Sequence, residues 1–343
     1  MKILYTICLL LIGFAKPCST SAQDINFSQF YEMPLLRNPA LAGIFTGDVR
    51  LTSAFRNQWQ SVTVPYQTMA LGAEIRFASQ GDNDVYKTLG LLVTNDVAGD
   101  SKLKKIQVMP VFNLHMPINE DKNSFLSAAI MGGPTHQRFD PTNLYFDDQF
   151  VNGSYSPTNP TRQIFTNTNL TYWDVNAGLT YNSDVGYAGR YYVGVGIFHV
   201  ATPTVAFMKQ NDIKLNRKYV VNFGFSSPTS DQDKFTFYGD YFYQGGNALF
   251  QGCFSLSHSF EEDVEMDLRK GITGGIFYRW NDAIVPVLKL DLQQLSIGVS
   301  YDINVSKLKT ASQIRGGAEV TLSYKNFLYI RNNSSEKVRC PRL

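Results

Sequence analysis

The sequence predicts an all-β protein, a transmembrane antiparallel β-barrel of about 14 strands with an N-terminal non-strand segment. Stretches in which apolar and polar residues alternate recur along most of the chain, as half-buried strands require. Aromatic residues make up 13% of the 343 residues and charged residues 17%, whereas about 25% is charged in typical soluble proteins. After the first residues, no apolar run is long enough for a spanning helix. A chain that crosses a bilayer without helices must close into a barrel, which pairs every backbone polar group.

The range 295–304 shows the alternation most clearly. Its odd-numbered residues, such as Leu295 and Val299, are apolar, and its even-numbered residues, including Ser296 and Asp302, are small or polar. Successive side chains of a strand point to opposite faces, so one face is apolar and the other polar. About ten residues is also the length that a tilted strand needs to cross a bilayer. We therefore expect lipid on one face of this strand and water on the other.

Similar alternation predicts strands along the rest of the chain. Their ranges are 49–59, 66–77, 87–95, 105–116, 124–137, 172–181, 191–200, 218–226, 234–243, 248–260, 268–280, 284–291 and 317–329. Charged residues recur on the polar faces: Arg50, Arg56, Glu74, Arg76, Asp174, Asp240, Arg279, Asp302, Glu319 and Lys325. Such charges are costly in a dry core and are solvated in a water-filled lumen. In a secreted β-sandwich they would lie on the outer faces, so the alternation alone leaves that architecture open.

The lengths of the connectors favour the barrel. With an even number of strands, both ends of the barrel chain lie on one side of the membrane, and the connectors alternate between the two sides. Those that would face outward include 60–65, 139–169, 201–213 and 305–316, and most of the others are shorter. Short periplasmic turns and long external loops are typical of outer-membrane barrels.

The first 22 residues have the features of a signal peptide. Lys2 supplies a positive start, residues 3–14 form a short apolar core, and the small residues 20–22 precede the expected cleavage site. We therefore expect export, with a mature chain that begins at Gln23. Cys253 and Cys340 then remain, and two cysteines do not form a disulfide framework.

The sequence divides into four parts. Residues 1–22 are the signal peptide, 23–47 an N-terminal plug or periplasmic segment, 48–330 the barrel and 331–343 a periplasmic C-terminal tail. Residues 24–47 do not alternate and contain Pro34 and Pro39, so a plug under the barrel and a short helix on a soluble core both remain open.

No catalytic, metal or cofactor site is predicted. The four histidines are dispersed and show no metal-ligand spacing, and neither a nucleophile elbow nor a phosphate-binding loop is present. The net charge of +2 does not suggest a nucleic-acid partner. We expect a protein that is not an enzyme and has outer-membrane lipid around it.

Four groups of residues resemble one known family. They are Phe27, Ser28, Gln29, Phe30 and Tyr31 with Pro34, Asn38, Pro39, Ala40 and Gly43; Arg56, Asn57, Gln58 and Trp59; Tyr301, Asp302 and Asn304; and Cys340 and Pro341. These motifs resemble the PorP/SprF family of the Bacteroidetes type IX secretion system. The last residue, Leu343, departs from the Phe that is more usual there.

The resemblance implies an outer-membrane barrel that helps to deliver or anchor secreted proteins at the cell surface. Such proteins include gliding adhesins with a C-terminal sorting domain, and further partners are type IX secretion components in the periplasm or outer membrane. Two alternatives stay open from the residues alone: a general porin or small-solute channel, and a soluble secreted β-sandwich binding protein.

The long connector at 139–169 is the expected contact with a secreted partner. It carries Tyr145, Phe146, Phe150, Tyr155 and Phe165, and buried aromatic residues often anchor protein interfaces. The alternative is that these residues only cover the mouth of the barrel.

Overall fold

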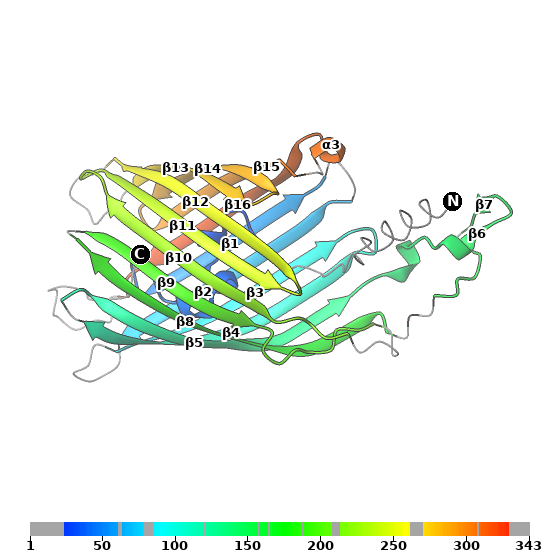
Figure 1. Cartoon of the computed structure of the whole chain (residues 1–343), viewed down its shortest axis with the longest axis horizontal. Helices are drawn as coiled ribbons and strands as arrows, with labels where there is room; N and C mark the ends of the chain where they lie inside the picture. The colour runs from blue at the N-terminus through cyan, green and yellow to red at the C-terminus, as the bar shows by residue number, and fades with distance from the viewer. Residues whose placement is uncertain are drawn as a thin grey trace, which may run out of the picture.

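The computed structural model describes residues 24–60, 64–78, 85–119, 121–156, 158–163, 165, 167–186, 188–207, 213–260, 270–306 and 309–328. Fourteen strands form one closed antiparallel barrel, which confirms the predicted fold class (Figure 1). The predicted signal peptide (1–22), the 261–269 connector and the predicted C-terminal tail (331–343) lie outside the described residues.

The barrel strands follow one another in chain order around the wall, except where a small hairpin intervenes. They are β1 (Val49–Gln58), β2 (Tyr66–Ala78), β3 (Tyr86–Ala98), β4 (Leu103–Asn119), β5 (Ser124–Arg138), β8 (Asn169–Val185), β9 (Gly189–Phe198), β10 (Lys218–Pro228), β11 (Asp233–Gln244), β12 (Asn247–Ser259), β13 (Lys270–Arg279), β14 (Ala283–Leu292), β15 (Leu295–Asn304) and β16 (Arg315–Asn326). β1 pairs with β16 along its whole length and closes the barrel. The predicted strand at 317–329 ends earlier, at Asn326, because the chain leaves the sheet there.

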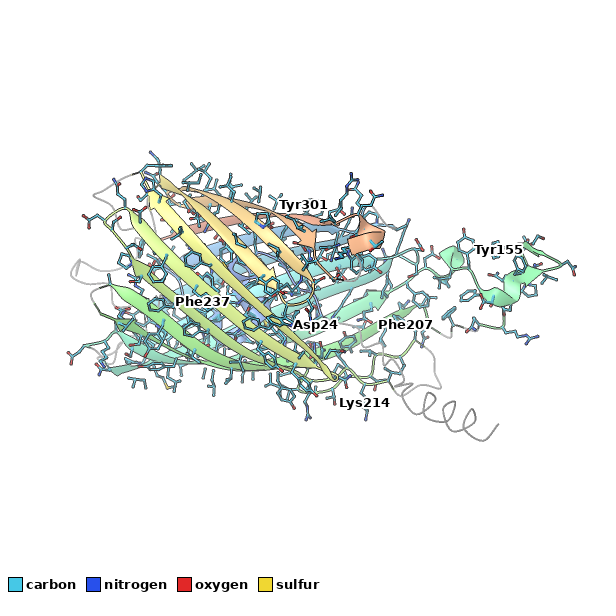
Figure 2. All side chains as sticks on the ribbon, turned by 45° about the horizontal axis from the view of Figure 1, so that its top comes forward. Asp24, Tyr155, Phe207, Lys214, Phe237 and Tyr301 are labelled. Carbon is cyan, nitrogen blue, oxygen red and sulfur yellow. The ribbon has the colours of Figure 1, made fainter. Side chains whose placement is uncertain are left out.

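The outward faces of the strands are apolar. In β1, Leu51 and Phe55 point outward and are 48% and 45% exposed, while Arg50 and Arg56 point inward and are buried. Phe237 and Tyr301 show the same outward orientation on other strands (Figure 2). An apolar outer surface over a charged interior is the arrangement of a membrane barrel, in which lipid covers the outside. Among the described residues, no helix is long and apolar enough to cross a bilayer.

The two ends of the barrel differ. At the terminal end, residue 48 enters β1 and β16 ends. At the opposite end, which we call the arm end, residues 139–168 form an arm that projects well beyond the barrel (Figure 1). The sequence predicts only a long connector here, but the arm contains two 3₁₀ turns, η3 (Pro141–Asn143) and η4 (Asp147–Gln149), and a hairpin of β6 (Phe150–Val151) and β7 (Ser154–Tyr155). A short helix, α3 (Lys309–Ser312), lies in the β15–β16 connector, also at the arm end.

Residues 24–47, which we call the lumen segment, lie inside the barrel. They contain three short helical turns: η1 (Phe30–Glu32), α2 (Pro34–Arg37) and η2 (Pro39–Leu41). Proline stands at the first positions of α2 and η2, where its fixed φ and missing N–H are tolerated. Nearly all of the segment is buried although none of it joins the sheet.

Candidate functional site

The lumen segment runs the length of the barrel and is held along the way by side chains of the wall. Asp24 contacts Lys105, His199 and Lys218, all close to the arm end of their strands. At the other end of the segment, the amide of Asp48 donates to the carbonyl oxygen of Asn326, at the terminal end. The segment therefore passes through the lumen rather than lying wholly in the periplasm at the terminal end.

At the arm end, Asp24 is the centre of a charged cluster. Its Oδ2 lies 2.7 Å from His199 Nε2 and 3.2 Å from Lys218 Nζ, and its Oδ1 lies 3.4 Å from Lys105 Nζ. The other ring nitrogen of His199, Nδ1, lies 2.7 Å from Oδ2 of Asp174. Because an imidazole donates from both nitrogens only when it is protonated, this geometry fits an imidazolium between two carboxylates.

The pKa values in this cluster shift accordingly. Burial alone would raise the pKa of Asp24, but Lys218, Lys105 and His199 outweigh burial and hold that pKa well below its ordinary value. Burial alone would lower the pKa of His199, but Asp24 and Asp174 raise it above its ordinary value. Both shifts favour the charged forms, so the cluster is an ion-paired clasp on the start of the lumen segment.

The second anchor is Glu319 of β16. Its two carboxylate oxygens accept hydrogen bonds of 2.7 Å from the backbone amides of Ser28 and Gln29. The side chain of Gln29 accepts a further bond of 2.8 Å from Thr321 Oγ1. These contacts satisfy backbone N–H groups that precede the first helical turn and have no partner within it.

A third anchor is Asp302 of β15. It accepts a hydrogen bond of 2.5 Å from Ser28 Oγ, and its other oxygen lies 2.6 Å from Arg56 Nη2 and 2.8 Å from Arg279 Nη2. Asp302 is 1% exposed and both arginines are 6% exposed, so the three charges are largely shielded from water. Two cations facing one buried carboxylate fix its charged state by simple attraction.

Arg37 makes the most specific ion pair of the segment. Its Nε and Nη2 donate to the two carboxylate oxygens of Asp240 in β11, at 2.8 and 2.7 Å. The rings of Phe30, Tyr238 and Tyr192 surround the guanidinium, with centroids 4.9, 5.5 and 5.8 Å from Cζ. A bidentate pair with aromatic neighbours is a geometry that lysine does not reproduce.

Next to Arg37, the segment also contacts the β13–β14 side of the wall. Glu32 pairs with Lys289 at 2.8 Å. The ring of Tyr31 stacks between those of Tyr238 and Phe277, with both centroid distances at 5.4 Å. One acidic and one aromatic residue therefore dock η1 against β11, β13 and β14.

On the opposite side of the lumen, neutral hydrogen bonds of Asn38, and not ion pairs, hold the segment to the wall. Its Oδ1 accepts from the amide of Ala40 at 2.9 Å and so caps η2. Its Nδ2 donates to the carbonyl oxygen of Val195 at 3.1 Å and to Thr180 Oγ1 at 3.4 Å. The close approach requires glycine at position 178, where a Cβ would overlap Oδ1 of Asn38.

Near the terminal end, Gly43 completes the docking. Its φ of +78° is in the left-handed region that favours glycine. Its amide donates to Glu74 at 2.8 Å, and Glu74 also pairs with Arg50 at 2.8 Å. Arg76 donates to the carbonyl oxygens of Gly43 and Phe45 at 2.7 and 3.0 Å. Charged side chains of β1 and β2 thus bind the backbone of the segment as well as one another.

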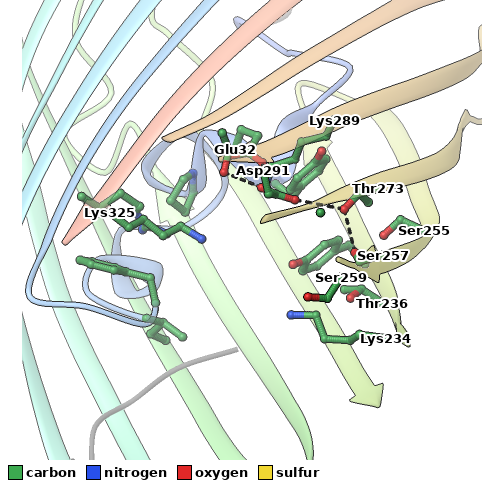
Figure 3. Close-up of a pocket in the computed structure, with 18 of the residues that line it drawn as sticks. Glu32, Lys234, Thr236, Ser255, Ser257, Ser259, Thr273, Lys289, Asp291 and Lys325 are labelled. Atoms are coloured by element: carbon green, nitrogen blue, oxygen red, sulfur yellow. Dashed lines mark hydrogen bonds and ion pairs between the residues drawn. The ribbon is translucent and has the colours of Figure 1, made fainter. Parts of the chain in front are cut away.

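Among the described residues, two larger cavities lie mostly on the side of the lumen where β10 to β14 are, and a smaller one of about 30 Å³ lies toward β4, β5 and β8. The lower cavity, at the terminal end, has a volume of about 150 Å³ and is lined by hydroxyl groups and charged residues (Figure 3). The upper cavity, toward the arm end, has a volume of about 60 Å³ and is mostly apolar, with Phe27, Phe30, Met33, Leu36 and Phe242 in its lining.

The aromatic residues of the arm lie in two groups. Tyr145 and Tyr155 contact each other, with centroids 4.9 Å apart, and Tyr155 lies far from the barrel (Figure 2). Phe146 packs on Phe165 near the root of the arm. Tyr145 is 76% exposed and Phe150 59% exposed, so the outer part of the arm presents aromatic surface to solvent.

The motif residues that resemble the known family mostly meet in the lumen. Residues 27–31, 34, 38–40 and 43 all belong to the lumen segment, and Arg56 and Asp302 contact it from the wall. The others in the described part of the chain lie elsewhere: Tyr301 faces outward, Asn57 and Gln58 end β1 at the arm end, Trp59 follows them against Tyr66, and the side chain of Asn304 bonds Ser312. Cys340 and Pro341 lie outside the described residues.

Several anchors were not singled out from the sequence. Asp24, Glu32, Arg37, Lys105, His199, Lys218 and Lys289 all form ion pairs between the segment and the wall. The available signal was a charged residue on the lumen face of a strand, which had identified Asp240 but not its partner Arg37. Within the described part of the chain, no group of His, Cys, Asp and Glu side chains is arranged to hold a metal ion.

Comparisons with solved structures found matches at low sequence identity. Solved structures with a similar fold include the toluene transporter TbuX of Ralstonia pickettii, at 10% identity over 86% of this chain and 93% of that chain, with a TM-score of 0.49. BamA of Haemophilus ducreyi lacking POTRA domains 1–3 matches at 10% identity over 81% and 70%, with a TM-score of 0.40. The monoaromatic hydrocarbon channel CymD matches at 12% identity over 87% and 93%, with a TM-score of 0.47. No curated protein matches the sequence.

A family model extends over most of the chain. The model for the type IX secretion system membrane protein PorP/SprF matches residues 19–324. This range contains the lumen segment, the arm and nearly all of β16. The chain therefore belongs to the PorP/SprF family of type IX secretion system membrane proteins.

Proposed function

We propose that this protein is a non-enzymatic outer-membrane barrel that helps to deliver or anchor secreted proteins at the cell surface. The secreted proteins would be those with a C-terminal sorting domain, such as gliding adhesins, and the barrel would work with other type IX secretion components. The observation that carries the proposal is the combination of an occupied lumen with an arm of exposed aromatic residues. The surface outside the barrel, rather than an open pore, is then the working part.

The occupied lumen argues against the alternative of a general porin. A porin needs a continuous water-filled channel. Here buried ion pairs, among them Arg37–Asp240 and Glu32–Lys289, hold the lumen segment across the interior. Within the described part of the chain, only small cavities of about 150, 60 and 30 Å³ remain beside it.

The arm has the composition of a contact surface. Tyr145, Phe150, Val151 and Tyr155 gather on it, and Val151 is 46% exposed. Exposed aromatic residues clustered on one surface mark sites of interaction, and tyrosine is enriched among the residues that dominate binding energy. With both ends of the barrel chain in the periplasm, the arm lies outside the cell, where a secreted partner arrives.

The test is a capture experiment with the arm altered. Deletion of 141–165, and separately the triple variant Tyr145→Ser, Phe150→Ser and Tyr155→Ser, should leave a heat-modifiable barrel in the outer membrane and abolish co-purification of the secreted partner. The matched control is Gln163→Ser, a polar exposed position on the same arm. As a check on orientation, Val151→Cys in a Cys340→Ser background should react with an impermeant maleimide on intact cells. Unchanged co-purification with the triple variant would contradict the proposal.

A further inference from the structure

The lumen segment does not fill the barrel evenly. η2 packs against β4, β5, β8 and β9, whereas the two larger cavities lie mostly on the side of β10 to β14. The lumen faces there carry small residues, including Ser255 and Ser257 of β12 and Gly271 and Thr273 of β13. Small side chains on these strands leave room that the segment does not occupy.

The lower cavity is polar and lies at the terminal end. Thr273 Oγ1 lies 2.8 Å from Ser257 Oγ and 3.3 Å from a carboxylate oxygen of Asp291. Gln232 and Gln293, from two connectors at the terminal end, also line the cavity. Hydroxyl, amide and charged groups of this kind solvate water and ions.

The upper cavity lies near the arm end. Lys218, Gln244 and Asn247, which begin or end their strands at the arm end, line its rim. Its deeper lining is formed by apolar side chains of the lumen segment, such as Phe30 and Leu36. The two cavities therefore lie at different heights on the same side of the lumen.

Arg37 separates them. Among the described residues, it is the one that lines both cavities. Its guanidinium is 3% exposed and reaches from α2 across to Asp240 on β11. Asp240 is itself held by Asn222 Nδ2 at 2.7 Å and Gln251 Nε2 at 3.3 Å. A single rigidly held side chain, backed by the rings of Phe30 and Tyr238, thus forms the barrier.

The geometry points to a closed passage for water and small ions through this barrel, with the Arg37–Asp240 pair as its gate. The passage follows β11 to β13 from the lower cavity to the upper one. It opens when Arg37 leaves Asp240, without removal of the lumen segment, because the other anchors of the segment lie elsewhere on the wall. Conduction in this state is distinct from the proposed capture of proteins by the arm.

The experiment is single-channel recording of the purified full-length protein in a planar bilayer. We expect no stable conductance from the wild type and a small stable conductance from Arg37→Ser. In Arg37→Ser the carboxylate of Asp240 faces the passage, so the current should be cation-selective. The double variant Arg37→Ser/Asp240→Asn, which leaves no unpaired charge, should conduct as well. In a KCl gradient its reversal potential should be shifted, relative to that of Arg37→Ser, toward the equilibrium potential of chloride, because the cation selectivity is reduced.

Asn38→Ala is the matched control. It weakens the hold of the segment on β8 and β9 but leaves Arg37 in place, so it should stay closed. Folded arginine variants without conductance would overturn the gate. The gate would also be overturned if Asn38→Ala and both arginine variants shared a large conductance that did not depend on the charge at position 240. Such a result would indicate that the whole lumen segment has left the barrel. Neither result bears on capture by the arm.

Discussion

Asn38 and Gly178 share one site, since the side-chain oxygen of Asn38 occupies the space where a Cβ of residue 178 would lie. A strand glycine is usually unfavourable because it has no side chain to pack and adds entropy to the unfolded chain. Here it lets the lumen segment approach the wall closely enough for Asn38 to bond Val195 and Thr180.

Gly178→Ala should therefore destabilise the barrel by about 1–3 kcal/mol, the usual cost of overpacking. The measurement is the temperature at which the folded form disappears in semi-native electrophoresis, followed by urea titration in detergent. Gly274→Ala is the control, since a Cβ at that position meets nothing within 4 Å. Equal stability of the two variants would show that Asn38 has room to move.

Asp302→Asn should be more damaging than Ser28→Ala, although an amide oxygen at position 302 can still accept from Ser28 Oγ. Loss of the Asp302 charge leaves Arg56 and Arg279 facing each other without their shared carboxylate. Removing one partner of a buried ion pair costs about 3–5 kcal/mol, whereas losing one hydrogen bond to a charged group costs about 1.5–3 kcal/mol. Urea unfolding of the purified variants measures the difference, and similar losses would show that water already screens the two arginines.

The clasp at Asp24 should weaken as the pH rises. The pKa of His199 is raised above its ordinary value of 6.5 in the folded protein, so its contribution is complete below 6.5 and is lost as the pH rises through the raised pKa. The pKa of Asp24 is lowered below 3.8, so its contribution holds above 3.8 and fails only in strong acid. Both groups are therefore charged, and the clasp is strongest, in the pH range between weak acid and the raised pKa of His199.

Hydrogen exchange followed by mass spectrometry checks this directly. Amides of residues 25–30 should lose protection above the pKa of His199 by more than the intrinsic pH dependence of exchange. In His199→Gln the same amides should be less protected at every pH and show no such step. A step that persists in the variant would assign the titration to another group, such as Lys105.

The strands were predictable because a membrane barrel has lipid outside its wall and water inside, so apolar and polar residues alternate along each strand. Arg50 and Arg56 face the lumen and Leu51 and Phe55 face outward, as the alternation indicated. The hairpin β6–β7 was missed because its strands are only two residues long. Its turn, Asn152-Gly153 with φ of 55° and 80°, is the local signal that was available.

The candidate site was predictable only in part. The motif at 27–31 drew attention to the lumen segment, and the inward charges drew attention to the wall. Which charge meets which depends on curvature and register: Arg37 and Asp240 are 203 positions apart, and Ser28 and Glu319 are 291 apart. No local pattern encodes such pairings, so the anchors emerged only from the folded barrel.

The position of the lumen segment has a consequence for biogenesis. The segment immediately precedes β1, and β1 forms the final seam with β16, the last strand of the barrel. Residues 38–42 contact β4, β8 and β9, all far from that seam. We expect the growing sheet to curve around the segment first and to close at the β1–β16 seam only afterwards. The same 24 residues would then act as a template for barrel closure during membrane insertion.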